Sequence, residues 1–132
     1  MTDGISKERR IVTEEDLVSQ YFKLVTNKDV DNLLNMFAHD AVVYEPFSKS
    51  EEGLRGRSAI EPFLRVVMMA NDRLLHNIVI EKKQHSENNV QVVALVTFEK
   101  GDKVKGRFTF EFDSDDGLDH EGRIKTLQIQ FI

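Results

Sequence analysis

The sequence contains no cysteine and no long hydrophobic run. Without cysteine there can be no disulfide framework, thiolate metal site or cysteine nucleophile, and nothing indicates an oxidising compartment. No apolar stretch approaches the roughly 20 residues of a membrane-spanning helix. Residues 1–16 carry charges throughout and lack the apolar core of a signal peptide. We therefore expect a cytoplasmic protein with no membrane partner.

An excess of basic charge is also lacking. The formal net charge is -5, from 18 Lys and Arg against 23 Asp and Glu, and the acidic residues are spread along the chain. This pattern argues against a nucleic-acid partner or an anionic membrane surface. A length of 132 residues suits one hydrophobic core. We expect a flexible leader over residues 1–12 and a single domain over residues 13–132.

The segment after the leader carries the signals of two helices. Thr13 precedes three acidic residues, which is typical of a helix start, and apolar residues at helical spacing predict a helix over residues 13–26. Asp29 is expected to cap a second, shorter helix. The apolar side of this second helix should include Met36 and Phe37.

A strand and a third helix are expected next. Residues 41–45 are rich in β-forming types and end before a proline, which favours an extended conformation. Residues 48–57 are charged and contain two glycines, so they predict a surface loop. Ser58 and Glu61 match a capping box, which predicts that the third helix starts at Ser58.

The second half of the chain changes to period-two alternation. Four runs are predicted as strands: residues 74–83, 90–100, 104–113 and 123–132. Turn signals separate them at residues 86–89, 101–102 and 114–122. Helices followed by an antiparallel meander predict an α+β fold, with three N-terminal helices packed on a strongly curved, mostly antiparallel sheet. The opposite sheet face is polar, which predicts a solvated surface or a subunit interface.

Two segments resemble a known family. NKDVDNLLNMFAHDAVVYEP, residues 27–46, and LRGRSAIEPFL, residues 54–64, are similar to the nuclear transport factor 2-like superfamily. That superfamily includes SnoaL-like cyclases and ketosteroid isomerases. The resemblance implies a cone-shaped α+β barrel that encloses a pocket for a small hydrophobic molecule. It also implies a homodimer formed through the sheet face.

The resemblance places two residues at catalytic positions. Tyr21 aligns with the oxyanion-stabilising tyrosine of ketosteroid isomerases, and Glu45 aligns with their catalytic carboxylate. Phe108 occupies the position of the protonated aspartic acid, and an aromatic ring cannot donate a hydrogen bond to an oxyanion. Losing such a donor commonly costs roughly 2.7–4 kcal/mol of transition-state stabilisation. Efficient steroid-type isomerisation is therefore not expected without another donor.

Structural roles for these residues are open alternatives. Tyr21 fits a buried helix face with its hydroxyl bonded to backbone or water. Glu45 fits an exposed strand end, or an ion pair with one of three arginines: Arg55, Arg57 or Arg65. His76 shares a predicted strand face with Ile78 and Ile80. It is a candidate general acid or base if that face looks into the pocket, and otherwise a core or interface histidine.

No motif indicates a cofactor. A P-loop, a dinucleotide fingerprint and a serine-hydrolase elbow are all lacking, and the histidines have no metal-site spacing. We expect no cofactor and no metal, with Phe63, Phe108 and Phe110 lining a ligand pocket. Two hypotheses remain: a cofactor-independent isomerase, cyclase or dehydratase that uses Tyr21 and Glu45, or a non-catalytic ligand-binding or dimerisation module.

Overall fold

The computed structural model describes residues 13–47, 51–70, 75–85, 89–100, 102–113 and 123–132. The helices are α2 (Glu14–Thr26), α3 (Val30–Asn35) and α4 (Arg57–Ala70). The strands are β1 (Phe37–Tyr44), β2 (Leu54–Arg55), β3 (Leu75–His85), β4 (Asn89–Lys100), β5 (Asp102–Asp113) and β6 (Ile124–Phe131). The expected leader, residues 1–12, and the expected turn at residues 114–122 lie outside the described residues.

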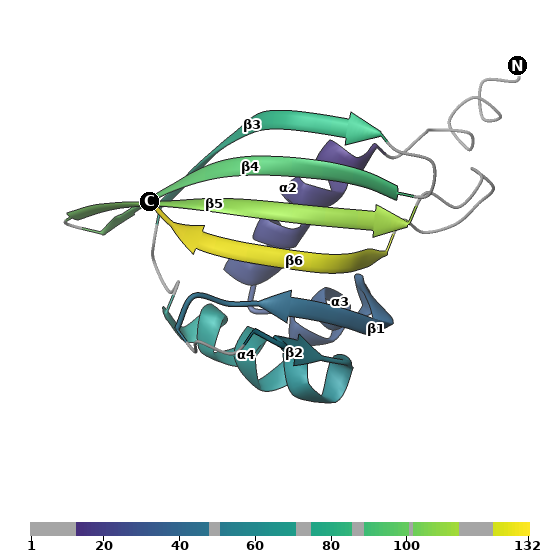
Figure 1. Ribbon diagram of the computed structural model, residues 1–132. Coiled ribbons are helices and arrows are strands. Elements are labelled where there is room, and N and C mark those ends of the chain that lie inside the picture. Colours follow the sequence, from purple (N-terminus) through teal and green to yellow (C-terminus); the bar gives the residue numbers. More distant parts are fainter. Residues whose placement is uncertain (1–12, 48–50, 71–74, 86–88, 101, 114–122) are drawn as a thin grey trace, which may run out of the picture.

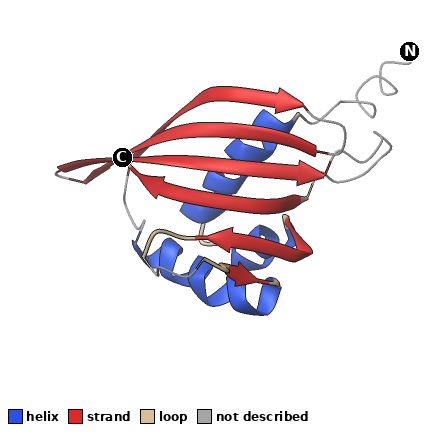
Figure 2. Ribbon diagram, viewed as in Figure 1, coloured by secondary structure: helices blue, strands red, loops and turns tan. Residues whose placement is uncertain are grey.

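The strands form one six-stranded sheet in the order β2-β1-β6-β5-β4-β3. Neighbouring strands are antiparallel except for β1 and β6, which run parallel. The sheet is curved and unclosed, and the helices lie together behind it (Figures 1 and 2). The predicted α+β architecture is therefore confirmed, with the helices preceding the long antiparallel strands in the chain.

Helix α2 begins as the sequence predicts and is held to the edge of the sheet. Thr13 and Asp16 form a capping box through two backbone-to-side-chain bonds of 3.1 Å. The Lys83 ammonium of β3 lies 3.1 Å from the Glu14 carboxylate and 2.9 Å from that of Glu15. The hydrogen bond between Lys83 and Glu15 lowers the pKa of Glu15 and raises the pKa of Lys83. This cluster connects the first turn of α2 to the edge strand.

The structure corrects one helix boundary. Met36 is the C-cap of α3, and Phe37 is the first residue of β1, not part of the apolar side of the helix. The Ile124 N–H donates to the Met36 carbonyl at 2.7 Å, and Phe37 pairs with Ile124 of β6. Pairing with a strand from the other end of the chain therefore ends the helix.

A second correction concerns the start of α4. Ser58 lies inside the first turn and is not its cap, because the Gly56 carbonyl accepts the amides of Ala59 and Ile60 at 3.1 and 3.0 Å. The expected loop over residues 48–57 also contains the short strand β2. This strand forms by pairing with β1, and the local sequence of residues 48–57 does not indicate that pairing.

The two sheet faces have different compositions. The inner face, toward the helices, carries fully buried side chains such as Val92, Phe110, Phe112 and Leu127. The outer face carries the alternate residues of the same strands, including Thr109, which lies opposite Gln128. Alternation in the sequence predicted this division, because period two assigns each side chain to one face.

Gly53 provides a test of the β1–β2 connection. Its φ is +72°, and an added Cβ would lie 2.9 Å from the Val43 carbonyl oxygen and from side-chain atoms of Val42 and Tyr44. We expect Gly53→Ala to lower the free energy of unfolding by more than the roughly 1–2 kcal/mol of left-handed strain. Gly56→Ala is the matched control, because φ is +84° but the nearest atom lies at 3.8 Å. Equal losses in urea denaturation would contradict the close contact at Gly53.

Candidate functional site

Tyr21 lies in a cage of phenylalanine rings between α2 and the sheet. Its ring centroid lies 4.9 Å from that of Phe22, 6.5 Å from Phe37, 6.5 Å from Phe108 and 5.3 Å from Phe110. These are edge-on or tilted arrangements, which aromatic pairs prefer to face-to-face stacking. Tyr21 is 1% exposed. The aromatic cage, as we call these four phenylalanines, therefore encloses the ring on several sides.

The Tyr21 hydroxyl is a buried polar group without a partner. It has no hydrogen-bond partner in the structure, and burial raises the pKa of Tyr21 well above its ordinary value. The hydroxyl therefore stays protonated across neutral pH and can act as a donor but not as a base. Because nearly all buried polar groups are paired, an unpaired hydroxyl calls for a specific explanation.

Glu45 follows the last residue of β1 and is half-buried. Its carboxylate Oε1 accepts the Phe47 N–H at 2.6 Å. Two of the arginines considered as partners bind elsewhere: Arg57 donates twice to the Phe37 carbonyl, and Arg65 donates to Glu61. The Glu45 carboxylate is not hydrogen-bonded to Tyr21, since that hydroxyl has no partner.

The sheet register relates Glu45 to the aromatic cage. Val43 pairs with Leu127 of β6, and Leu127 pairs with Phe110 of β5. All three side chains are completely buried on the inner face. Glu45 comes two residues after Val43 and directly after the last residue of β1. The register thus relates the last residues of β1, just before Glu45, to the strand that carries Phe110.

Of the remaining predicted site residues, only some belong to the aromatic cage. Phe108 and Phe110 stack at 6.3 Å and contribute to the aromatic cage. Phe63 lies on α4, partly buried and packed against the core. His76 is part of β3 and pairs with Phe98, but its side chain lies outside the described residues. The structure therefore brings Tyr21, Phe108 and Phe110 together, while the predicted role of His76 is untested.

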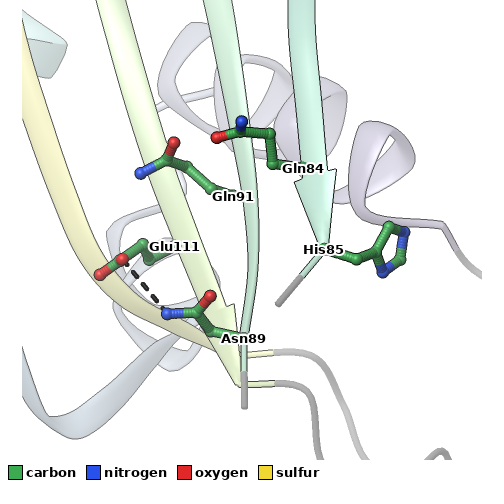
Figure 3. A pocket seen from close by; sticks show the side chains of 5 residues that line it. All are labelled: Gln84, His85, Asn89, Gln91 and Glu111. Atoms are coloured by element: carbon green, nitrogen blue, oxygen red, sulfur yellow. Dashed lines mark hydrogen bonds between the residues drawn. The ribbon is translucent and has the colours of Figure 1, made fainter. Parts of the chain in front are cut away.

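An open, polar depression lies at one end of the sheet, away from the aromatic cage. It has a volume of about 460 Å³ and is lined by Gln84, His85, Asn89, Gln91 and Glu111. The Asn89 amide donates to the Glu111 carboxylate at 3.3 Å, while the His85 ring points away from the other four side chains (Figure 3). Its location and polarity do not suit the hydrophobic ligand predicted from the sequence.

Within the described residues, no cluster of His, Asp or Glu could hold a metal ion. In that same part of the chain, no helix is long and apolar enough to cross a membrane.

The sequence matches the SnoaL-like domain family over residues 18–119. The chain therefore belongs to the SnoaL-like family, as its resemblance to the wider superfamily predicted. No curated protein matches the sequence significantly.

Solved structures share the fold at low sequence identity. A putative calcium/calmodulin-dependent protein kinase type II association domain from Thiobacillus denitrificans is 13% identical with a TM-score of 0.77, covering 91% of this chain and 95% of that one. An NTF-2 like protein of unknown function from Pseudomonas aeruginosa is 15% identical with a TM-score of 0.71, covering 90% and 98%. An epoxide hydrolase/cyclase-like enzyme of salinomycin pyran-ring formation is 21% identical with a TM-score of 0.57, covering 100% and 95%. At these identities the likeness establishes the fold alone.

Sequence reasoning did not predict the contacts that Phe22 and Phe37 make with Tyr21. Phe22 is adjacent to Tyr21 in the helix, where neighbouring side chains point in different directions, so spacing does not predict their contact. Phe37 was assigned to a helix and lies instead on the inner face of β1. An aromatic residue directly after the α3 cap was the available signal, because such residues favour strands.

Replacing Tyr21 with phenylalanine tests the unpaired hydroxyl. An unsatisfied buried polar group costs roughly 1–3 kcal/mol, so Tyr21→Phe should leave the free energy of unfolding unchanged or increase it. Tyr21→Ala should lower it by about 3–5 kcal/mol, because it empties the centre of the aromatic cage. Both values can be measured by urea denaturation. A clear loss of stability in Tyr21→Phe would mean that the hydroxyl has a partner, such as a buried water.

Proposed function

We propose that this SnoaL-like protein binds a small hydrophobic carbonyl compound and acts on it as a cofactor-independent isomerase, cyclase or dehydratase. The observation that carries the proposal is the unpaired Tyr21 hydroxyl inside the aromatic cage. A carbonyl oxygen would accept this hydrogen bond and remove the cost of the buried donor. The apolar part of the ligand would pack against the surrounding rings.

The chemistry divides between two groups. The Glu45 carboxylate removes a proton from the carbon beside the carbonyl, and the electron pair moves onto the carbonyl oxygen. The Tyr21 O–H stabilises the resulting enolate, and its raised pKa keeps the proton on the hydroxyl. Glu45 then returns the proton to the substrate at another carbon, or the enolate expels a leaving group. Neither route requires an oxidant or a reductant.

Ligand access requires side-chain movement. The ring centroids of Phe22 and Phe108 lie 5.1 Å apart, and both side chains are buried. The Tyr21 hydroxyl itself has no appreciable accessible surface. A ligand that reaches the hydroxyl must therefore displace side chains that surround Tyr21. Phe108 also supplies an apolar wall in place of a second donor, so the proposed reaction depends on Tyr21 for stabilisation of the oxyanion.

Hydrogen exchange on carbon tests this function. We expect the protein to accelerate α-hydrogen exchange of apolar cyclic ketones in D₂O, followed by proton NMR. Glu45→Gln should reduce the rate by about 10²–10⁴-fold, and Tyr21→Phe by about 10²–10³-fold. Glu61→Gln is the matched carboxylate control, because Glu61 lies on α4 and pairs with Arg65. Full exchange activity in Glu45→Gln would rule out the proposed base.

A second candidate is a non-catalytic module that dimerises through the outer sheet face. Three aliphatic residues lie on the part of this face formed by β3 and β4: Val79 is opposite Leu95, and Val93 is two residues before Leu95 in β4. Val79 is 53% exposed. Aliphatic groups on the face away from the helices favour burial against another surface. The likeness to a kinase association domain adds support for assembly, although it establishes only the fold.

The oligomeric state tests this second candidate. We expect a dimer in sedimentation velocity, and Leu95→Lys should weaken its association at least about tenfold, because it would bury an unpaired charge. Val66→Lys is the control, since Val66 is 60% exposed and lies on α4, not on a strand of the sheet. A monomeric wild-type protein, or equal effects of the two substitutions, would contradict dimerisation through this face.

A further inference from the structure

Two exposed phenylalanines contact each other at one end of the sheet. Phe47 is 73% exposed and Phe131 is 49% exposed. Their ring centroids lie 5.7 Å apart at an interplanar angle of 62°. Edge-on aromatic pairs of this kind contribute beyond simple burial. We call Phe47 and Phe131 the aromatic clasp.

Phe131 occupies the outermost position of the inner face. Exposure rises along β6 from 0% at Leu127 through 7% at Ile129 to 49% at Phe131. Phe131 lies opposite Gly106 of β5, and the following residue donates its amide to the Lys105 carbonyl at 3.0 Å. The backbone on both sides of Phe131 is thus held to the sheet. The Phe131 ring therefore contacts Phe47 from a backbone position that is paired in the sheet.

Phe47 connects Phe131 to Glu45. Pro46 lies between them and has no N–H to donate. The first amide after the proline is that of Phe47, and it donates to Glu45 Oε1 at 2.6 Å. A turn closed by such a bond fixes the carboxylate of Glu45 relative to the Phe47 backbone. Contacts thus run from Phe131 through Phe47 to Glu45.

We propose that the aromatic clasp orients the Glu45 carboxylate, with Phe131 and Phe47 acting as positioning residues for the base. This inference rests on the proposed role of Glu45. The two oxygens of a carboxylate rotate together, so holding Oε1 sets the direction of the whole group. Without the Phe131 ring, the residue 45–47 turn loses its aromatic contact with the sheet, and the orientation of Glu45 is held less tightly. A base that is held in its reactive orientation reacts faster than a base that samples several orientations.

NMR of the ligand-free protein tests the clasp directly. In Phe131→Ala, exchange of the Phe47 amide hydrogen should accelerate by roughly two- to tenfold, which is the change expected from losing one aromatic pair. The ¹³C signal of the Glu45 carboxyl carbon should also shift. Phe131→Tyr keeps the ring and should restore both signals. Met69→Ala is the control, because Met69 is 76% exposed on α4.

The result that overturns the clasp is an unchanged Phe47 amide and Glu45 carboxyl signal in Phe131→Ala. A change that Phe131→Tyr fails to restore would also overturn it, because the ring itself would not be responsible. The functional arm uses the same cyclic ketones: Phe131→Ala should lower kcat with KM little changed. An unaltered kcat would overturn the positioning role. An inactive wild-type protein would instead contradict the proposed function, while the NMR signals still decide whether the clasp orients Glu45.

Discussion

The contact between Tyr21 and the phenylalanines of the sheet joins the first helix to the middle of the sheet. It joins α2 to β5 through Phe108 and Phe110, and to β1 through Phe37. These strands lie on either side of β6, so one helical side chain spans the middle of the sheet. A curved sheet leaves its inner face to be covered by helices, and a large ring fills that space with few conformational degrees of freedom.

The proposed function places stability and chemistry in conflict at Tyr21. An aromatic residue at position 21 is needed for packing, but packing alone would be served better by phenylalanine, since the hydroxyl has no partner. Local departures from good packing are expected at functional sites, where stability is given up for another role. Under the proposed function, a ligand that accepts this hydrogen bond would offset the cost of the unpaired hydroxyl.

Sequence patterns predicted the faces of the fold but not its contacts across the chain. Alternation placed Phe108 and Phe110 on one face, and capping chemistry located the start of α2. The boundary at Phe37 could not be read locally, because it depends on pairing with Ile124, far along the chain. In the candidate site too, the residues could be predicted from the sequence but their contacts could not. A resemblance indicated Tyr21 and Glu45, while the bond from the Phe47 amide to Glu45 depends on a turn geometry that residue types do not specify.

The phenylalanine at position 108 limits what the proposed site could do. A second donor there would share the enolate charge with Tyr21, whereas a ring leaves that charge facing an apolar wall. The loss of transition-state stabilisation from the missing second donor is largest when a full negative charge develops on the oxygen. It is smaller when a leaving group departs as the proton is removed, because the charge then passes through the oxygen only in part. Elimination or cyclisation therefore suits a site with one donor better than isomerisation through a free enolate.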